Sequence, residues 1–390
     1  MKRILYVIPG LNPSRNDGAS NRCNSFISCF ADNGYEVTCL ALTNYKDYLE
    51  AYRHRSTYTS KAKWKLLPHL YFLDNRMKNI YLIFEKLYIF ILNLFNGYDF
   101  ILADYATGAD IVSWVKGKTK IIVNYRGDQI DEHIMLHQCS ESCPSVGNLR
   151  RLLRKSVQIA DYSISVSEQL QQNVEEYAGC ALKANYIFPC CADISRFKGI
   201  KEREDFEGRI VLGYFGGLSK WQCIDAVIEM AIGLNRMDGR YLLLILTNSP
   251  TDDILARLEE LGTDNYMIRS IGFSEVPLWI SQMDISFNLR EDRPLNTVSS
   301  PTKLSESLAA GVPVVVTEFS GDYKEIVVDG RTGVVLRDLK ASDENLRKVD
   351  SFIQYKLTDD EKVRESCRAA VENRTWQQYS LGLINFLESR

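Results

Sequence analysis

Short apolar stretches alternate with longer amphipathic stretches along the whole chain. Ten of the short stretches are hydrophobic on both faces, which is typical of strands buried in a parallel sheet. Five are in the first half: residues 3–10, 36–42, 99–104, 120–127 and 162–167. Five are in the second half: residues 209–217, 241–248, 266–273, 284–290 and 312–316. Parallel strands need crossovers, which the helical stretches supply. The pattern predicts an α/β protein with two doubly wound, Rossmann-like domains.

A chain of 390 residues is too long for one usual core, so two domains are expected. The strand pattern stops at Pro189, and a charged, loop-like segment precedes the next strand. We predict a first domain at residues 1–195 and a second at residues 196–373. No strand follows the last helix, so residues 374–390 are expected to cross back and cover the first domain. A central cleft is expected between the domains.

Composition excludes some partners. The net charge of −3 and the 45% of hydrophobic residues describe an ordinary soluble protein with no general attraction to nucleic acid. The first apolar run stops at Pro9 and no small-residue cleavage site follows, which favours a first strand over a signal peptide. We therefore expect a cytoplasmic protein whose ten cysteines stay reduced.

Ligands of open parallel sheets bind at the carboxyl ends of the strands. Three loops at such ends contain glycines or precede a helix: residues 9–22, 213–222 and 290–303. These loops are the predicted binding region, because glycines let a ligand approach the backbone and helix N-termini present free N–H groups.

The helix after the third loop has an unusual first turn. Ser300 suits the N-cap, Pro301 suits the first helical position, and Gly311 ends the helix. Lys303 is unfavourable for the helix dipole there, and a bound phosphate or diphosphate would remove the conflict. Glu306 is on the same face, where its carboxylate would accept both hydroxyls of a ribose. The alternative is a surface ion pair between Lys303 and Glu306.

Residues 209–336 resemble the donor-binding domain of glycosyltransferase family 4, the retaining enzymes of the GT-B fold. The resemblance is in "VLGYFGGLSKWQCIDAVIEMA", "IGFSEVPLWISQMDISFNLR" and "SPTKLSESLAAGVPVVV". The stretch "VSEQLQQNVEEYAG" resembles the interdomain region, and "GGLSKWQ" resembles bacterial enzymes that build surface polysaccharides.

The resemblance implies transfer of a sugar from a nucleotide donor, UDP- or GDP-linked, to a glycan or lipid-linked acceptor. It implies no metal, because basic side chains and amides stabilise the leaving diphosphate. The donor-site residues that it implies are Gly216, Gly217, Lys220, Pro301, Thr302, Lys303 and Glu306.

The sequence departs from the family at two points. The first of two family glutamates falls on Val298, which leaves its role to the backbone, to Glu291 or to Asp292. The family's basic pair falls on Gly217 and Gln222, and Lys220 is the nearest substitute. The missing glutamate keeps open a non-catalytic nucleotide- or glycan-binding protein. A sugar-nucleotide epimerase of the same fold is the other alternative.

The acceptor side is expected in the first domain. Gly18 matches a glycine-rich loop of the family, although a turn that needs positive φ is the simpler interpretation. Many relatives have a histidine after the strand at residues 120–127, where this chain has Arg126, Asp128 and Glu132; these are site residues or loop-stabilising pairs. The predicted acceptor-binding residues are Gly18, Ala19, Asn21 and Glu132. The predicted catalytic residues are Arg126, Asp128 and Lys303, and no nucleophile is assigned.

Two further segments have other possible roles. His133, His137, Cys139 and Cys143 offer zinc-type ligands, but their spacing is not that of a common zinc site, and reduced cysteines with surface histidines are the alternative. Residues 51–98 are rich in basic and aromatic residues, and a helix that packs its aromatic residues inward with solvated lysines is the first interpretation. An amphipathic helix at an anionic membrane is the second. Binding of single-stranded nucleic acid is the third and least favoured interpretation.

Overall fold

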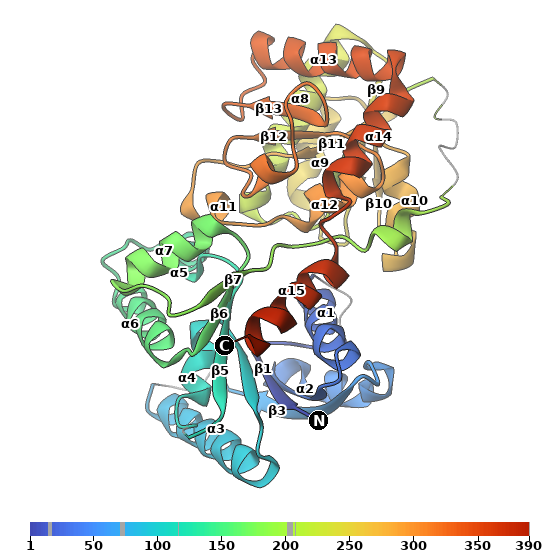
Figure 1. Cartoon of the computed structure of the whole chain (residues 1–390). Coiled ribbons are helices and arrows are strands. Elements are labelled where there is room, and N and C mark those ends of the chain that lie inside the picture. The colour runs from blue at the N-terminus through green and yellow to red at the C-terminus, as the bar shows by residue number, and fades with distance from the viewer. Residues whose placement is uncertain (15–17, 71–74, 116, 201–205, 207, 390) are drawn as a thin grey trace. The chain divides into compact units, whose positions relative to one another are not determined.

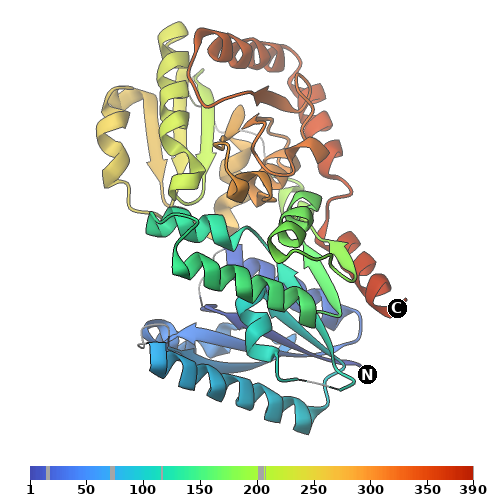
Figure 2. The same cartoon turned by 90° about the vertical axis from the view of Figure 1, so that its left-hand side faces the viewer.

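The computed structural model describes residues 1–14, 18–70, 75–115, 117–200, 206 and 208–389, without the side chains of residues 18, 19 and 75–78. The chain forms two compact units. One comprises Met1–Pro189 and Trp376–Arg390, and the other comprises Cys190–Thr375. Each has a parallel sheet with helices on both faces (Figures 1 and 2). The predicted fold class is confirmed.

The sheet of the first unit has seven strands in the order β3-β2-β1-β4-β5-β6-β7, and all pairs are parallel. The strands are β1 (Arg3–Pro9), β2 (Glu36–Asn44), β3 (Ala62–His69), β4 (Phe100–Asp104), β5 (Lys120–Tyr125), β6 (Tyr162–Ser165) and β7 (Asn185–Ile187). The sequence did not predict β3 and β7. Both are edge strands whose residues are mostly half-exposed, so neither has the two-sided apolar run of a central strand.

The helices of the first unit follow the predicted crossovers. They are α1 (Gly18–Asp32), α2 (Tyr45–Arg53), α3 (Asn75–Asn96), α4 (Tyr105–Val112), α5 (Gln129–His137), α6 (Pro144–Ile159), α7 (Glu168–Ala178) and α15 (Trp376–Glu388). Helices α1 and α15 lie on one face of the sheet, and α3, α4 and α6 lie on the other (Figure 1). The Phe188 ring stacks on Tyr379 of α15 at 5.8 Å. The last helix therefore packs on the first domain, as predicted.

The segment at residues 51–98 is not one amphipathic helix. It contains the end of α2, the edge strand β3 and the long helix α3. The prediction is wrong for residues 62–69 because the alternation of Lys63, Trp64 and Lys65 has the two-residue period of a strand.

The sheet of the second unit has six parallel strands in the order β10-β9-β8-β11-β12-β13. They are β8 (Ile210–Phe215), β9 (Tyr241–Leu246), β10 (Tyr266–Arg269), β11 (Ile285–Asn288), β12 (Val314–Thr317) and β13 (Gly333–Leu336). The main helices are α8 (Ile224–Met237), α9 (Asp252–Glu259), α10 (Val276–Ser281), α11 (Pro294–Thr297), α12 (Thr302–Ala309), α13 (Asp343–Thr358) and α14 (Asp360–Val371). The short edge strand β13 was not predicted. It begins at Gly333, where a Cβ atom would lie 2.1 Å from the Val314 carbonyl oxygen.

The division between the units falls after Pro189, ahead of the expected join at residue 195. The difference arises because Ala192 and Phe197 are buried in the core of the second unit. No helix in the described ranges is long and apolar enough to cross a bilayer. All ten cysteines are free thiols.

Candidate functional site

Helix α12 is the predicted site helix, and its first turn is open. Its N-cap residue is Pro301, and no side chain caps it. The prediction that Ser300 caps the helix is wrong, because the buried Ser300 hydroxyl accepts hydrogen bonds from the Cys190 amide (2.8 Å) and from Arg374 Nη2 (3.0 Å). The first amides of α12 therefore lack an acceptor within the helix, as at any helix start. Gly311, at φ +77°, follows the end of the helix as predicted.

A buried arginine anchors the loop before α12. Arg374 is 4% exposed and forms ion pairs with Asp322 and with Glu325 (2.8 Å). It also donates to the Cys190 carbonyl oxygen (3.2 Å), and the Asp322 amide donates to the Ser299 carbonyl (3.1 Å). These bonds fix the backbone from which the first turn of α12 starts.

Lys303 lies across the glycine turn that follows β8. Its Nζ donates to Gln222 Oε1 at 2.7 Å and lies 4.5 Å from the centroid of the Tyr214 ring. Gly216 has a φ of +113°, and a Cβ atom there would lie 2.5 Å from Lys303 Cε. The turn must therefore have a glycine for Lys303 to take this position. Burial, followed by the charge of Arg290, lowers the pKa of Lys303.

Arg290, which was not among the predicted site residues, is a second cation beside Gln222. It follows β11 and is 4% exposed. Its Nη2 donates to the same Gln222 Oε1 at 2.8 Å, and its Nη1 donates to the Leu289 carbonyl at 2.7 Å. Burial lowers its pKa. The signal that could have found it is its place directly after a buried strand, at the carboxyl end of the sheet.

Lys303 and Arg290 share one neutral acceptor and form no ion pair within the described ranges. Because Lys303 Nζ and Arg290 Nη2 lie 2.7 and 2.8 Å from the same oxygen, the two nitrogens are at most about 5.5 Å apart. At the effective dielectric constant of protein sites, two unit charges within that distance repel by roughly 3 kcal/mol or more. Buried charges are ordinarily paired. We therefore call Lys303, Arg290 and Gln222 the cation cluster; its excess positive charge suits an anion with at least two negative charges.

Glu306 lies one helical turn beyond Lys303. Burial raises the pKa of Glu306 to about 7, although Arg196 and Lys303 act in the opposite direction. Arg196 itself stacks on the Phe273 ring at 3.8 Å. Glu306 is therefore not part of the cation cluster, and it lies near the pair formed by Arg196 and Phe273.

The other predicted donor residues are less involved. The Gly217 carbonyl accepts a hydrogen bond from the Tyr214 hydroxyl (2.5 Å), and Thr302 is exposed at the start of α12. The Lys220 side chain is exposed, and it is not among the groups that contact Lys303. Val298, at the position of the missing glutamate, is 4% exposed.

The two acidic residues offered in place of that glutamate lie on the loop after β11. Glu291 Oε1 is 3.9 Å from Arg293 Nε, and the Asp292 side chain is exposed. Their roles stay predictions.

In the first unit, Arg126 belongs to a buried polar network that the sequence did not reveal. Arg126 Nη2 is 3.1 Å from the Asp104 carboxylate, which also accepts from Tyr6 (3.0 Å) and Asn124 (2.7 Å). The Arg126 guanidinium lies 4.7 Å from the Tyr105 ring, and its Nε has no hydrogen-bond partner in the described ranges. Burial, the largest single effect, lowers the pKa of Arg126, but Asp104, Tyr105 and Tyr6 together outweigh it, so that the pKa of Arg126 is raised. Arg126 is therefore held as a permanent cation.

Asp128 has a structural role beside any catalytic one. Its Oδ1 caps α5 by accepting from the Ile130 and Asp131 amides (2.9 and 3.0 Å), and its Oδ2 accepts from Asn173 (3.2 Å). Burial raises the pKa of Asp128. Burial, then the charge of Asp128, raises the pKa of Glu132.

The remaining acceptor-side predictions fall at the start of α1. Gly18 is the first residue of that helix, and the side chain of Ala19 lies outside the description. Asn21 is half-buried, and its carbonyl accepts from Ser25 (2.9 Å). Their role stays a prediction.

The zinc interpretation of His133, His137, Cys139 and Cys143 is not supported. Among the residues that the structure describes, no group of three or more His, Cys, Asp or Glu side chains has an arrangement that could hold a metal ion. The centroids of the two imidazole rings lie 4.3 Å apart with the rings tilted by 45°, and His133 Nε2 bonds to the Ser145 hydroxyl (2.9 Å).

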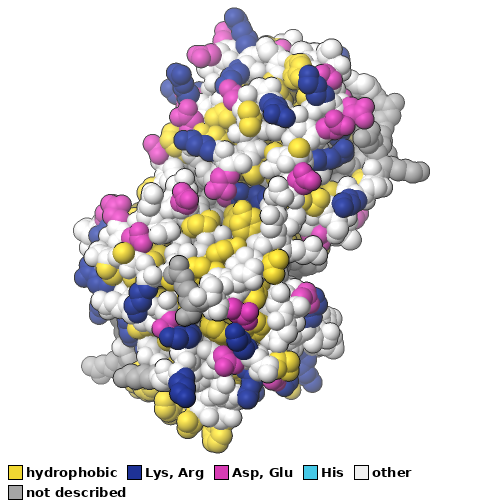
Figure 3. All heavy atoms as spheres, in the orientation of Figure 1, with side chains coloured by type: hydrophobic (Ala, Val, Ile, Leu, Met, Phe, Trp, Pro, Cys, Tyr) yellow, Lys and Arg dark blue, Asp and Glu magenta, His cyan; other side chains and the backbone are white. Residues whose placement is uncertain are grey.

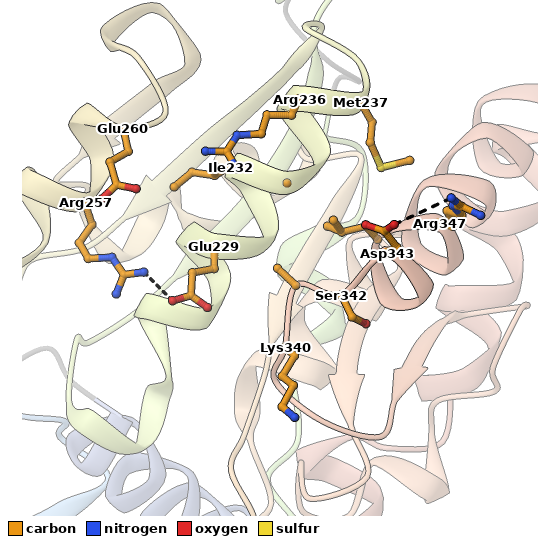
Figure 4. Close-up of a pocket in the computed structure, with 13 residues that line it drawn as sticks. Glu229, Ile232, Arg236, Met237, Arg257, Glu260, Lys340, Ser342, Asp343 and Arg347 are labelled. Carbon is orange, nitrogen blue, oxygen red and sulfur yellow. Dashed lines mark hydrogen bonds and ion pairs between the residues drawn. The ribbon is translucent and has the colours of Figure 1, made fainter.

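A pocket of about 860 Å³ lies away from these residues, between α8, α9 and α13 (Figure 4). Ion pairs of Arg257 with Glu229 (2.6 Å) and of Arg347 with Asp343 (4.0 Å) form part of its wall. The pocket is lined by the second half of α8. The glycine turn lies before the first half of that helix and is therefore not part of the pocket. No predicted site residue lines it.

Solved structures share this fold at low sequence identity. Sucrose-phosphate synthase from Thermosynechococcus elongatus is 14% identical, with a TM-score of 0.77 and coverage of 100% of this chain and 99% of that chain. HepE from Anabaena, in complex with UDP, is 15% identical, with a TM-score of 0.70 and full coverage of both chains. WaaG, a glycosyltransferase involved in lipopolysaccharide biosynthesis, is 14% identical, with a TM-score of 0.70 and coverage of 99% and 100%.

Identities this low show a shared fold, and no curated protein sequence matches the chain. The second unit is similar to a known family at the level of sequence. Its residues 209–352, which include the glycine turn, the cation cluster and α12, match the family model described as "Glycosyl transferases group 1".

Proposed function

We propose that the protein is a retaining glycosyltransferase of family 4 that moves a sugar, of the hexosyl type, from a nucleotide donor to a glycan or lipid-linked acceptor. The observation that carries the proposal is the cation cluster, which lies inside the segment matched by the glycosyltransferase family model. We place the reaction at the cytoplasmic face of the membrane, in the synthesis of a surface polysaccharide or glycoconjugate.

The donor diphosphate would lie between Lys303, Arg290 and the open amides of Thr302 and Lys303. Gly216 makes room for the Lys303 side chain at this point, and Glu306 would accept hydrogen bonds from the ribose hydroxyls. HepE, which shares the fold, has been solved with UDP and with UDP-glucose. These structures support a UDP-linked donor over other nucleotides, with a GDP-linked donor as the second choice.

The chemistry requires stabilisation of a leaving group. As the bond between the sugar C1 and the diphosphate oxygen breaks, negative charge develops on that oxygen; an acceptor hydroxyl oxygen bonds to C1, and its proton passes to the departing diphosphate. Preorganised cations and amides stabilise such charge best because they need no rearrangement during the reaction. Lys303 and Arg290 would supply this charge in the role that other enzymes give to a metal ion.

The acceptor is assigned to the first unit. Arg126, fixed by Asp104, would present a permanent positive charge, and Glu132 and Asp128 would provide nearby carboxylates. Gly18, Ala19 and Asn21, at the start of α1, complete the proposed acceptor residues.

Nucleotide binding tests the proposal directly. Thermal unfolding is measured with UDP, GDP, ADP, CMP and dTDP, and UDP or GDP at a hundred times its dissociation constant should add about 2.7 kcal/mol of stability. A panel of sugar donors then separates the alternatives. A transferase releases nucleoside diphosphate and glycosylates the acceptor, an epimerase yields free epimerised donor, and a non-catalytic binder releases nothing. No stabilisation by any nucleotide would contradict the proposal.

A further inference from the structure

Helix α3 turns an apolar face towards solvent. Its exposed large side chains are Ile80 (61%), Ile83 (51%), Phe84 (48%), Leu87 (45%), Phe90 (40%), Ile91 (41%), Leu94 (70%) and Phe95 (83%). They recur every three or four residues, so they share one side of the helix. Figure 3 shows hydrophobic side chains gathered along α3 at the lower end of the view. We call these eight residues the α3 face.

The two charged side chains of α3 that the structure describes, Glu85 and Lys86, point the other way. Glu85 is fully buried and pairs with His69 of β3, with 2.5 Å between Oε1 and Nδ1. Lys86 is 8% exposed and pairs with Asp110 of α4 at 2.9 Å. An ordinary surface helix has the reverse arrangement, with charged residues facing water and apolar residues facing the core. The two buried ion pairs hold α3 in the orientation that exposes the α3 face.

The α3 face is larger than an ordinary surface patch. Eight large side chains that are on average about half exposed present on the order of 800 Å² of apolar surface, above the roughly 300–600 Å² of the largest patch on a typical monomer. An exposed apolar surface of this size is typical of an interaction site. The charges around it indicate which kind of partner it fits.

Two lysines without ion-pair partners in the described ranges lie on segments that contact α3. Lys65 lies on β3, on the same side of the strand as His69, which contacts α3. Lys118 is exposed and precedes Thr119, whose hydroxyl bonds to Asn93 of α3. Neither lysine forms an ion pair within the described ranges. Acidic side chains nearby, such as Glu85 and Asp110, are already paired inwards.

An apolar face with such cations on neighbouring segments is complementary to a bilayer with anionic headgroups. Trp114, which is 41% exposed in the connection between α4 and β5, adds an amphipathic ring of the kind found at such interfaces. We propose that α3 lies on the surface of an anionic membrane, with Leu94, Phe95 and their neighbours among the acyl chains and Lys65 and Lys118 at the phosphates. This surface goes beyond the proposed transfer reaction and does not depend on it.

Vesicle flotation tests this surface without a donor or acceptor. The full chain is mixed with phosphatidylcholine vesicles with or without phosphatidylglycerol. The parent protein should float with the anionic vesicles, and the double variant Leu94→Glu/Phe95→Glu should bind them at least roughly tenfold more weakly. The matched control is Leu278→Glu/Leu381→Glu, which changes apolar residues that are 47% and 56% exposed elsewhere and should float like the parent.

The lysines are tested separately. Lys65→Glu/Lys118→Glu should lower binding to anionic vesicles by roughly fivefold or more for each lysine and leave any binding to neutral vesicles unchanged. Unfolding midpoints close to that of the parent show that the variants are folded. The proposal is overturned if the parent floats with neither vesicle or if Leu94→Glu/Phe95→Glu floats like the parent. A parent dimer in light scattering that this variant dissociates would assign the α3 face to a second copy instead.

Discussion

Replacement of Arg290 by methionine separates the role of the cation cluster in binding from its role in folding. The substitution keeps an apolar stem of similar length and removes one of the two charges that share Gln222 Oε1. Lys303 keeps its own hydrogen bond to that oxygen, so the amide remains satisfied. The two consequences have opposite signs.

The magnitudes follow from the geometry. Without nucleotide, the variant loses a repulsion of roughly 3 kcal/mol between the two cations and a buried charge that had no acid partner, so its free energy of unfolding should equal or exceed that of the parent. With nucleotide, it loses a charge-assisted hydrogen bond of roughly 1.5–3 kcal/mol to the diphosphate. Nucleoside diphosphate affinity should therefore fall by about ten- to hundredfold.

The assay is calorimetric titration with UDP or GDP, combined with denaturant unfolding in the absence of nucleotide. The matched control is Arg293→Met, on the same loop but 3.9 Å from the Glu291 carboxylate, which should leave affinity within about threefold of the parent. An Arg290→Met protein that is less stable than the parent and binds nucleotide equally well would refute the reasoning, because Arg290 would then be a structural residue.

Three further changes probe the same unit. Gln222→Glu gives both cations the acid partner that they lack, so denaturant unfolding should show a more stable protein and titration should show nucleoside diphosphate binding lost by a hundredfold or more. Because the pKa of Glu306 is raised to about 7, its neutral form contributes stability that is present below about pH 4.5 and is lost as the pH rises through about 7. Nucleotide affinity should rise as the pH passes through about 7, because the carboxylate then forms. Glu306→Gln should remove the pH dependence of both stability and affinity. Arg374→Met leaves the Asp322 carboxylate buried without its partner and should lower the free energy of unfolding by about 3–5 kcal/mol, whereas a stable variant would show that the anchor is not needed.

The central strands could be predicted from the sequence because burial on two faces leaves a continuous apolar run. The edge strands β3 and β7 could not, since their residues are mostly half-exposed, and in β3 the apolar run is interrupted by Lys63 and Lys65. Ser300 shows the same limit at a helix start. Its type and position suit an N-cap, but its hydroxyl is used by Arg374, which is distant in sequence and close only in the folded chain.

Only one of the two cations in the cation cluster could be identified from local sequence patterns. Lys303 was identifiable because its position in a first turn conflicts with the helix dipole, a conflict between neighbours in sequence. Arg290 has no such local conflict. Its charge is anomalous only because β11 places it beside Lys303 and Gln222, with no carboxylate paired to either cation in the described ranges. A buried excess of charge is a property of the assembled sheet, and it is also the property that an anionic donor would use.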